Sequence, residues 1–164
     1  MRDIHQWHLD KGWENGCGYH FVIGNGTNSG DGQVETGPRW WNQATGAHTR
    51  LTEAIAERRG IESGHYNEYG IGIALVGNFE VDRPSEAQLD ALVNLALALM
   101  QECHIPLVRV VGHGEVDDTT CPGENFSMWD LRSRLRNAHW EKHSLSLGYT
   151  DPVVHDYRTI KYAP

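Results

Sequence analysis

Apolar residues cluster along the chain into short runs that predict β-strands. Residues 18–23, 71–77 and 105–111 each form such a run, bounded by glycine or polar residues. The run at 71–77 is apolar without interruption, so we expect this strand to be central and covered on both faces. A turn rich in Gly and Asn at 24–32 predicts that residues 33–36 return as the second arm of a hairpin.

Four other segments carry apolar residues at the spacing of a helix. The first covers residues 4–12 and ends at a glycine, and residues 51–59 predict a short peripheral helix inserted in a long connection. The clearest helix follows Ser85, an N-cap residue with Gln88 three positions on, because leucines and alanines then continue at helical spacing. Ser127 begins a last helix in the same way.

The alternation of strands and helices predicts an α/β fold. We expect a single domain at residues 1–142, with a central mixed β-sheet and helices on both of its faces. The tail at 143–164 differs, because Gly148 and Pro152 break it before a possible strand at 153–160. It is expected to form a linker and a C-terminal strand, which either stand apart or complete the same domain.

The composition narrows the classes of partner. Fourteen Lys and Arg stand against 22 Asp and Glu, and the net charge of −8 leaves no broad basic field for nucleic acid or an anionic membrane surface. The apolar runs fall short of the roughly 20 residues that span a bilayer, and residues 1–5 lead into polar sequence without an apolar signal core. We therefore expect neither a membrane span nor a signal peptide.

The candidate chemistry gathers in one loop that follows an expected strand. His113 and Cys121 lie on this loop, and an imidazole and a thiolate are ligands that suit zinc. Spacing alone leaves another interpretation open, a surface histidine beside a buried thiol. With three cysteines in 164 residues, a disulfide framework is not expected.

Further blocks in the sequence resemble one known family, and they occur in its order over about residues 3–135. These blocks are Ile4–His8, Gly12–Trp13, Gly18–Ile23, Gly46–His48, Asn67, Ile71–Gly77 and Gly112–Gly123. They resemble the zinc-dependent N-acetylmuramoyl-L-alanine amidases, which are related to bacteriophage lysozyme-type amidases and to peptidoglycan recognition proteins. The resemblance implies a hydrolase that cleaves the amide between N-acetylmuramic acid and L-alanine in peptidoglycan.

The resemblance also implies roles for individual residues. His113 and Cys121 match two of the three protein ligands of a catalytic Zn2+. Tyr19 matches a tyrosine that assists the zinc-bound water or the developing oxyanion, and Thr119 matches a residue that faces the scissile carbonyl.

The resemblance extends to the substrate groove. His48 and Asn67 match groove positions, although a loop histidine and a turn asparagine are the alternative interpretation. His8 and His20 are expected to serve in packing or in support of other residues rather than as ligands.

The third zinc ligand of the family is a histidine on a strand before the first helix, and the resembling region here begins after that position. Residues 153–159 resemble that strand, with His155 behind two β-branched residues. We therefore expect a circularly permuted domain, in which this segment enters the sheet and His155 completes the zinc site. A truncated chain or misplaced start, and a recognition domain without a complete metal site, remain as alternatives.

Two other functions compete with the amidase. A non-catalytic peptidoglycan-binding module would need neither Cys121 nor Tyr19, so their presence favours the enzyme. A cysteine hydrolase that uses Cys121 with His113 is disfavoured, because the sequence identifies no Asn or Asp to orient the histidine.

The expected partner is peptidoglycan, bound as a muramyl peptide, and the oligomeric state stays open. An enzyme made in the cytoplasm without a signal peptide would act on the cell wall in the manner of a phage lysin, or leave by a non-classical route. The sequence does not distinguish a phage from a bacterial source. The helix at 51–59 is expected at the rim of the groove, where it would bear on which peptide stem the protein accepts.

Overall fold

The computed structural model describes residues 1–13, 16–50 and 53–146, with side chains as far as residue 140. Its sheet is mixed and follows the order β2-β1-β3. The strands are β1 (Phe21–Ile23), β2 (Val34–Thr36) and β3 (Ile73–Leu75). β1 pairs antiparallel with β2 and parallel with β3, which confirms the expected mixed sheet and the hairpin.

The middle of this sheet is β1, so the expectation of a central strand at 71–77 is wrong for the described part of the chain. All three residues of β1 are buried, whereas every residue of β3 is partly exposed. β3 pairs with β1 on one side and has no second partner among the described residues. The unbroken apolar run therefore predicted a strand here, but neither its full burial nor its place in the sheet.

Helix α5 (Glu86–Glu102) supplies much of the buried core, and local sequence sets its start. Ser85 Oγ accepts a hydrogen bond from the backbone N–H of Gln88 at 3.0 Å. The Gln88 side-chain oxygen accepts one from the N–H of Ser85 at 3.2 Å. The expected capping box is therefore confirmed, and it satisfies N–H groups that a helix start leaves without partners.

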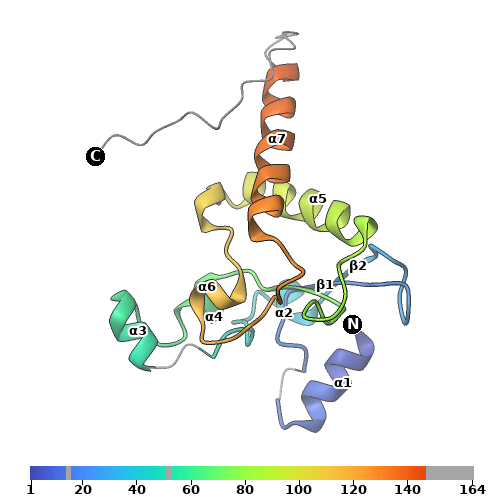
Figure 1. Cartoon of the computed structure of the whole chain (residues 1–164). Coiled ribbons are helices and arrows are strands. Elements are labelled where there is room, and N and C mark those ends of the chain that lie inside the picture. Colours follow the sequence, from blue (N-terminus) through green and yellow to red (C-terminus); the bar gives the residue numbers. More distant parts are fainter. Residues whose placement is uncertain (14–15, 51–52, 147–164) are drawn as a thin grey trace.

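The last helix, α7 (Met128–Ser146), begins at Ser127, whose Oγ accepts from Asp130 N at 3.1 Å, and it continues past residue 142. Figure 1 shows α5 and α7 on one side of the sheet and α1 (Arg2–Asp10) on the other. The main core joins β1, α5 and α7 through Ile23, Leu92, Val93, Ala96, Leu97, Leu131 and Leu135. No helix in the described ranges is long and apolar enough to cross a membrane.

The run at 105–111 forms no strand, which corrects the sequence prediction. Leu107–Arg109 is a turn of 3-10 helix (η1), in which Arg109 N donates to Pro106 O at 2.9 Å. Pro106 itself offers no N–H to a ladder. Val108 is 80% exposed, so the apolar run is not buried as a strand at this position would be.

Short helices surround the sheet. The predicted peripheral helix is confirmed as α3 (Glu53–Arg59), which packs with α4 (His65–Tyr69) in a small cluster apart from the main core. Helix α4 was not predicted, nor were the one-turn helices α2 (Pro38–Trp41) and α6 (His113–Val116). α6 opens the loop that carries the candidate chemistry.

Candidate active site

His113 and Cys121 lie on one loop that its own backbone closes. Gly114 N donates to Cys121 O at 2.7 Å, and Cys121 N donates to Thr119 Oγ1 at 3.2 Å. A Cβ at Gly114 would lie 2.7 Å from Thr119 O and 2.8 Å from Cys121 O, so only glycine fits there. The loop therefore holds three of the expected site residues in a defined arrangement.

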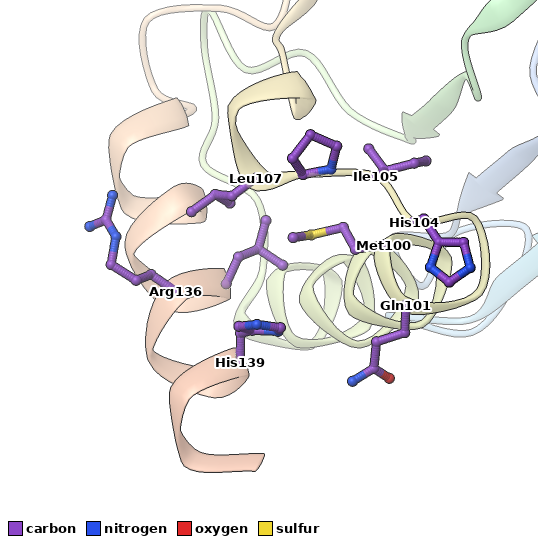
Figure 2. Close-up of a pocket in the computed structure, with 9 residues that line it drawn as sticks. Met100, Gln101, His104, Ile105, Leu107, Arg136 and His139 are labelled. Carbon is purple, nitrogen blue, oxygen red and sulfur yellow. The ribbon is translucent and has the colours of Figure 1, made fainter. Parts of the chain in front are cut away.

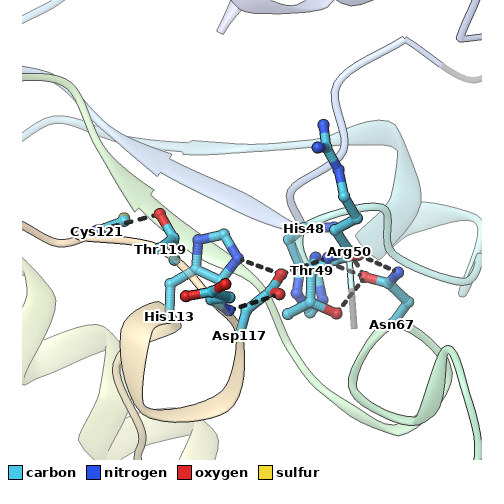
Figure 3. A network of polar contacts seen from close by, with 9 residues as sticks. His48, Thr49, Arg50, Asn67, His113, Asp117, Thr119 and Cys121 are labelled. Carbon is cyan, nitrogen blue, oxygen red and sulfur yellow. Dashed lines mark hydrogen bonds and ion pairs between the residues drawn. The ribbon is translucent and has the colours of Figure 1, made fainter. Parts of the chain in front are cut away.

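His113 is paired with a carboxylate four residues further along. Its Nε2 lies 3.2 Å from Asp117 Oδ2 (Figure 3). Burial by itself would raise the pKa of Asp117, but hydrogen bonds from Arg50 N, Asp118 N and the His113 ring outweigh it and hold that pKa below its usual range. Asp117 is therefore a carboxylate at neutral pH and can only accept hydrogen bonds.

Asn67, on α4, holds the segment that contains His48. Its Oδ1 accepts from His48 N at 2.8 Å and from Thr49 N at 2.9 Å, and its Nδ2 donates to Thr49 O at 2.8 Å (Figure 3). The side-chain amide of Asn67 is thus engaged with backbone groups of this chain. It therefore fixes the backbone of residues 48 and 49, which we call the groove wall after the groove position expected for His48.

His48 is tightly enclosed, and its neighbours include the loop histidine. Burial lowers the pKa of His48 to about 4, and the nearby His20 and His113 lower it as well. Its Nε2 lies 3.3 Å from Gly70 O, and a Cβ at Gly72 would come within 2.3 Å of its ring. His48 is therefore neutral at pH 7 and close enough to His113 for the two rings to interact electrostatically.

Tyr19, which lies just before β1, shares an electrostatic environment with the same loop. Burial raises the pKa of its phenol, and the thiols of Cys121 and Cys17 raise it further. Burial also raises the pKa of Cys121, with a contribution from Glu80. At neutral pH Tyr19 is therefore a protonated phenol beside the candidate ligand loop, able to donate a hydrogen bond.

Comparison with known proteins identifies the family of this chain. Residues 2–124 match the sequence profile described as N-acetylmuramoyl-L-alanine amidase. The chain belongs to the N-acetylmuramoyl-L-alanine amidase family. This finding confirms the resemblance that the sequence blocks carry.

Relatives of this amidase family include both endolysins and recognition proteins. Peptidoglycan-recognition protein LB of Drosophila melanogaster is 36% identical over 124 residues, which cover 75% of this chain and 43% of that protein. The endolysin of Escherichia phage T7 is 29% identical over 150 residues, which cover 88% of this chain and 77% of the endolysin. The chain thus spans less than half of the fly protein.

Solved structures of the family share the fold. An N-acetylmuramoyl-L-alanine amidase from Clostridium intestinale superposes with a TM-score of 0.60 and 27% identity, covering 82% of this chain and 74% of that one. Human PGRP-IBETAC, in complex with glycosamyl muramyl pentapeptide, gives a TM-score of 0.59 and 26% identity over 78% of this chain and 68% of that one. The α/β fold expected from the sequence is thereby confirmed.

The described residues do not by themselves complete a metal site. Within them, no three or more His, Cys, Asp or Glu side chains are grouped so that they could hold a metal ion. The loop offers one imidazole and one thiol, from His113 and Cys121, which fit zinc in kind and fall one short in number. His155, the expected third ligand, lies outside the described residues, as does the segment 153–159.

Other polar side chains near the site support the backbone. His8 and His20 are 4% and 7% exposed, and each accepts a backbone N–H through Nδ1, from Gly18 at 3.1 Å and Gly72 at 3.0 Å. This confirms their expected packing role. Arg39, missed by sequence reasoning, is 7% exposed and donates through Nε to Cys17 O at 2.8 Å and through Nη1 to Thr45 O.

A cavity of about 370 Å³ lies away from the loop that carries His113 and Cys121 (Figure 2). It is formed between the end of α5, the segment 104–107 and α7. Its lining includes Met100, His104, Ile105, Leu107, Leu135, Arg136 and His139. None of the described site residues predicted from the sequence lines it, so we do not identify it with the substrate groove.

Proposed function

We propose that the chain is a zinc-dependent N-acetylmuramoyl-L-alanine amidase that hydrolyses the amide between N-acetylmuramic acid and L-alanine in peptidoglycan. Membership of the family supports this function. The observation that carries it is one loop with His113 and Cys121 beside the protonated phenol of Tyr19. A Zn2+ ion held by these two side chains and a third ligand would polarise the carbonyl and activate a water molecule.

The chain's own polar groups divide the remaining work in this proposal. Tyr19, protonated at neutral pH, donates a hydrogen bond to the oxyanion that forms on the substrate. Thr119 Oγ1 accepts from Cys121 N, which leaves its hydroxyl hydrogen free to donate to the same oxygen. His48 lies on the groove wall as a neutral ring, and Asn67 holds that wall in place.

We propose His155 as the third ligand, and chain length supports it. α7 has 19 residues and is about 28 Å long. It begins next to the ligand loop, because a Cβ at Gly112 would lie 3.0 Å from Met128 Cγ. His155 lies nine positions after Ser146, and a fully extended segment of that length can span about 30 Å, which is enough to return along α7 to that loop.

The same proposal gives residues 143–164 a place in the domain formed by residues 1–142. One edge of β3 has no partner among the described strands, and its N–H and C=O groups are open to another strand. We propose that residues 153–159 pair in the sheet, as a circularly permuted domain requires. A ligand supplied by residues outside this sequence is the alternative.

Product analysis tests the enzyme directly. We expect the chain to release stem peptides with a free L-alanine amino terminus from purified peptidoglycan, as identified by mass spectrometry. A zinc chelator should abolish this release. A folded protein that releases no peptide would refute the proposed amidase.

A paired substitution tests the third ligand by metal content rather than activity. His155→Ala should lose stoichiometric zinc, because two ligands with an open cleft hold the ion weakly. His139→Ala is the control. His139 lines the separate cavity, so this variant protein should retain its zinc. Unchanged zinc in His155→Ala would refute this ligand and require the third donor to come from another residue of the tested protein.

A non-catalytic peptidoglycan-binding module is the second candidate function. It would need no third zinc ligand, and the described residues supply two candidates, His113 and Cys121. The similarity to human PGRP-IBETAC, which was solved with a muramyl pentapeptide, favours it. Binding of a muramyl pentapeptide without turnover, by protein supplied with zinc, would establish this alternative.

A cysteine hydrolase remains disfavoured for a different reason than the sequence suggested. Asp117 does lie against His113 and could orient it. However, burial raises the pKa of Cys121, whereas a nucleophilic cysteine needs a lowered one. We therefore retain zinc as the proposed cofactor. Because the proposed substrate is peptidoglycan, we propose the cell wall as the site of action.

A further inference from the structure

The Asp117 carboxylate joins two separate parts of the candidate site. It is 7% exposed, and its Oδ2 accepts from Arg50 N at 2.7 Å while lying 3.2 Å from His113 Nε2. Its Oδ1 accepts from Asp118 N at 2.9 Å. Figure 3 shows this carboxylate between the His113 ring and the segment that follows His48.

The contact with His113 determines which ring nitrogen carries hydrogen. A carboxylate only accepts, so the nitrogen facing it, Nε2, must be the donor. In a neutral imidazole the other nitrogen, Nδ1, then keeps its lone pair for a ligand. Metal-binding histidines commonly donate their second N–H to a carboxylate in this way, which fixes both the tautomer and the ring orientation.

The contact with Arg50 joins the groove wall to the ligand loop. Arg50 directly follows the pair His48–Thr49, whose backbone Asn67 holds on the other side. The wall is thus bonded to α4 through Asn67 and to the loop through Asp117. Movement of the loop would move the wall with it.

We propose that Asp117 is a positioning residue that orients His113, with Nδ1 available to the site, and that fastens the His48 wall to the ligand loop. The consequence for zinc rests on the proposed function. The positions of the His113 ring and of the Arg50 amide do not depend on the proposed function. They therefore provide a readout that is independent of metal and of activity.

Nuclear magnetic resonance of the metal-free full chain tests the contacts themselves. We expect a slowly exchanging imidazole hydrogen on His113 Nε2 and a protected Arg50 amide in the unaltered protein. Both should disappear in Asp117→Ala. Asp117→Asn keeps an oxygen acceptor and should restore part of the protection, and it serves as the test variant if the alanine variant does not fold.

Zinc affinity of the same proteins tests the consequence. Asp117→Ala should bind zinc about 10- to 100-fold more weakly, as loss of a partner behind a ligand histidine does. The matched control is Asp118→Ala. Asp118 donates to Asp117 through its backbone N–H and not through its side chain, so the zinc affinity of this variant should stay within twofold of the unaltered protein.

The two readouts separate this proposal from the proposed function. A hydrogen found on His113 Nδ1, or unchanged zinc affinity and Arg50 protection in Asp117→Ala, would overturn the positioning role. If the unaltered chain binds no zinc, and the imidazole and Arg50 signals still depend on Asp117, then the proposed metal is wrong and the positioning role stands.

Discussion

Replacement of Asn67 by alanine should loosen the groove wall and lower the stability of the domain together. The substitution removes three hydrogen bonds to the backbone of residues 48 and 49, with lengths of 2.8 to 2.9 Å. Each contributes about 0.5–1.5 kcal/mol net. Because the region is only partly buried, water replaces some of these bonds, and we expect a loss of about 2 kcal/mol in the free energy of unfolding.

Urea denaturation followed by circular dichroism measures this loss, and melting should fall by about 4–8 °C. Asn28→Ala is the control, because Asn28 makes one exposed hydrogen bond to Asp3 at 2.9 Å and should change stability by under about 0.5 kcal/mol. An equally small change in Asn67→Ala would show that its hydrogen bonds do not hold the wall.

Three other changes test other parts of the structure. Because burial lowers the pKa of His48 from 6.5 to about 4, the unfolded chain binds a proton that the folded chain excludes between these values. Stability should therefore fall as the pH drops from 6.5 towards 4, and urea titrations should show a smaller fall in His48→Ala. Gly114→Ala should distort the ligand loop, since its Cβ would lie 2.7 Å from Thr119 O, and zinc content measured by mass spectrometry should drop while the circular dichroism of the helices persists. Leu135→Ala should cost about 2–5 kcal/mol in urea unfolding because Leu135 is fully buried, and a cost under about 1 kcal/mol would contradict its core position.

The features that sequence predicted well are those encoded by neighbouring residues. The start of α5 depends on Ser85 and Gln88, three positions apart, and it forms as expected. The segment 105–111 failed because its apolar residues satisfy a strand pattern while Pro106 and the turn at Leu107–Arg109 set the backbone. Burial of an apolar run depends on tertiary partners, and the run itself does not reveal them.

The site shows the same division. His113 and Cys121 are close in sequence, and one loop closed by the hydrogen bond from Gly114 N to Cys121 O carries both of them. Their role as zinc ligands stays a prediction. Asp117 was missed although it lies only four residues from His113, because the sequence does not show that the short helix α6 brings the two side chains together. Its second bond, to Arg50, joins residues 67 positions apart, which no local pattern connects. His155 remains a prediction, because it lies outside the described residues.

The site loops are held mainly outside the sheet ladder, by backbone hydrogen bonds such as that from Ala47 N to Gly18 O and by side chains bonded to distant backbone groups. Each described strand has only three residues, so few ladder hydrogen bonds reach the loops. Asn67 instead bonds to residues 48–49, Asp117 to Arg50, and Arg39 to Cys17. We therefore expect the loops to open locally without unfolding of the core between α5 and α7.

Native-state hydrogen exchange tests this separation. The amides of residues 48–50 should exchange faster than those in the middle of α5, where Leu97 is 2% exposed. Exchange at 48–50 should also depend only weakly on urea, because local opening exposes little surface, whereas exchange in α5 should follow the global transition. If both regions exchanged with the same free energy and the same urea dependence, the site and the core would open as one unit, and the side-chain bonds would not form a separate layer of stability.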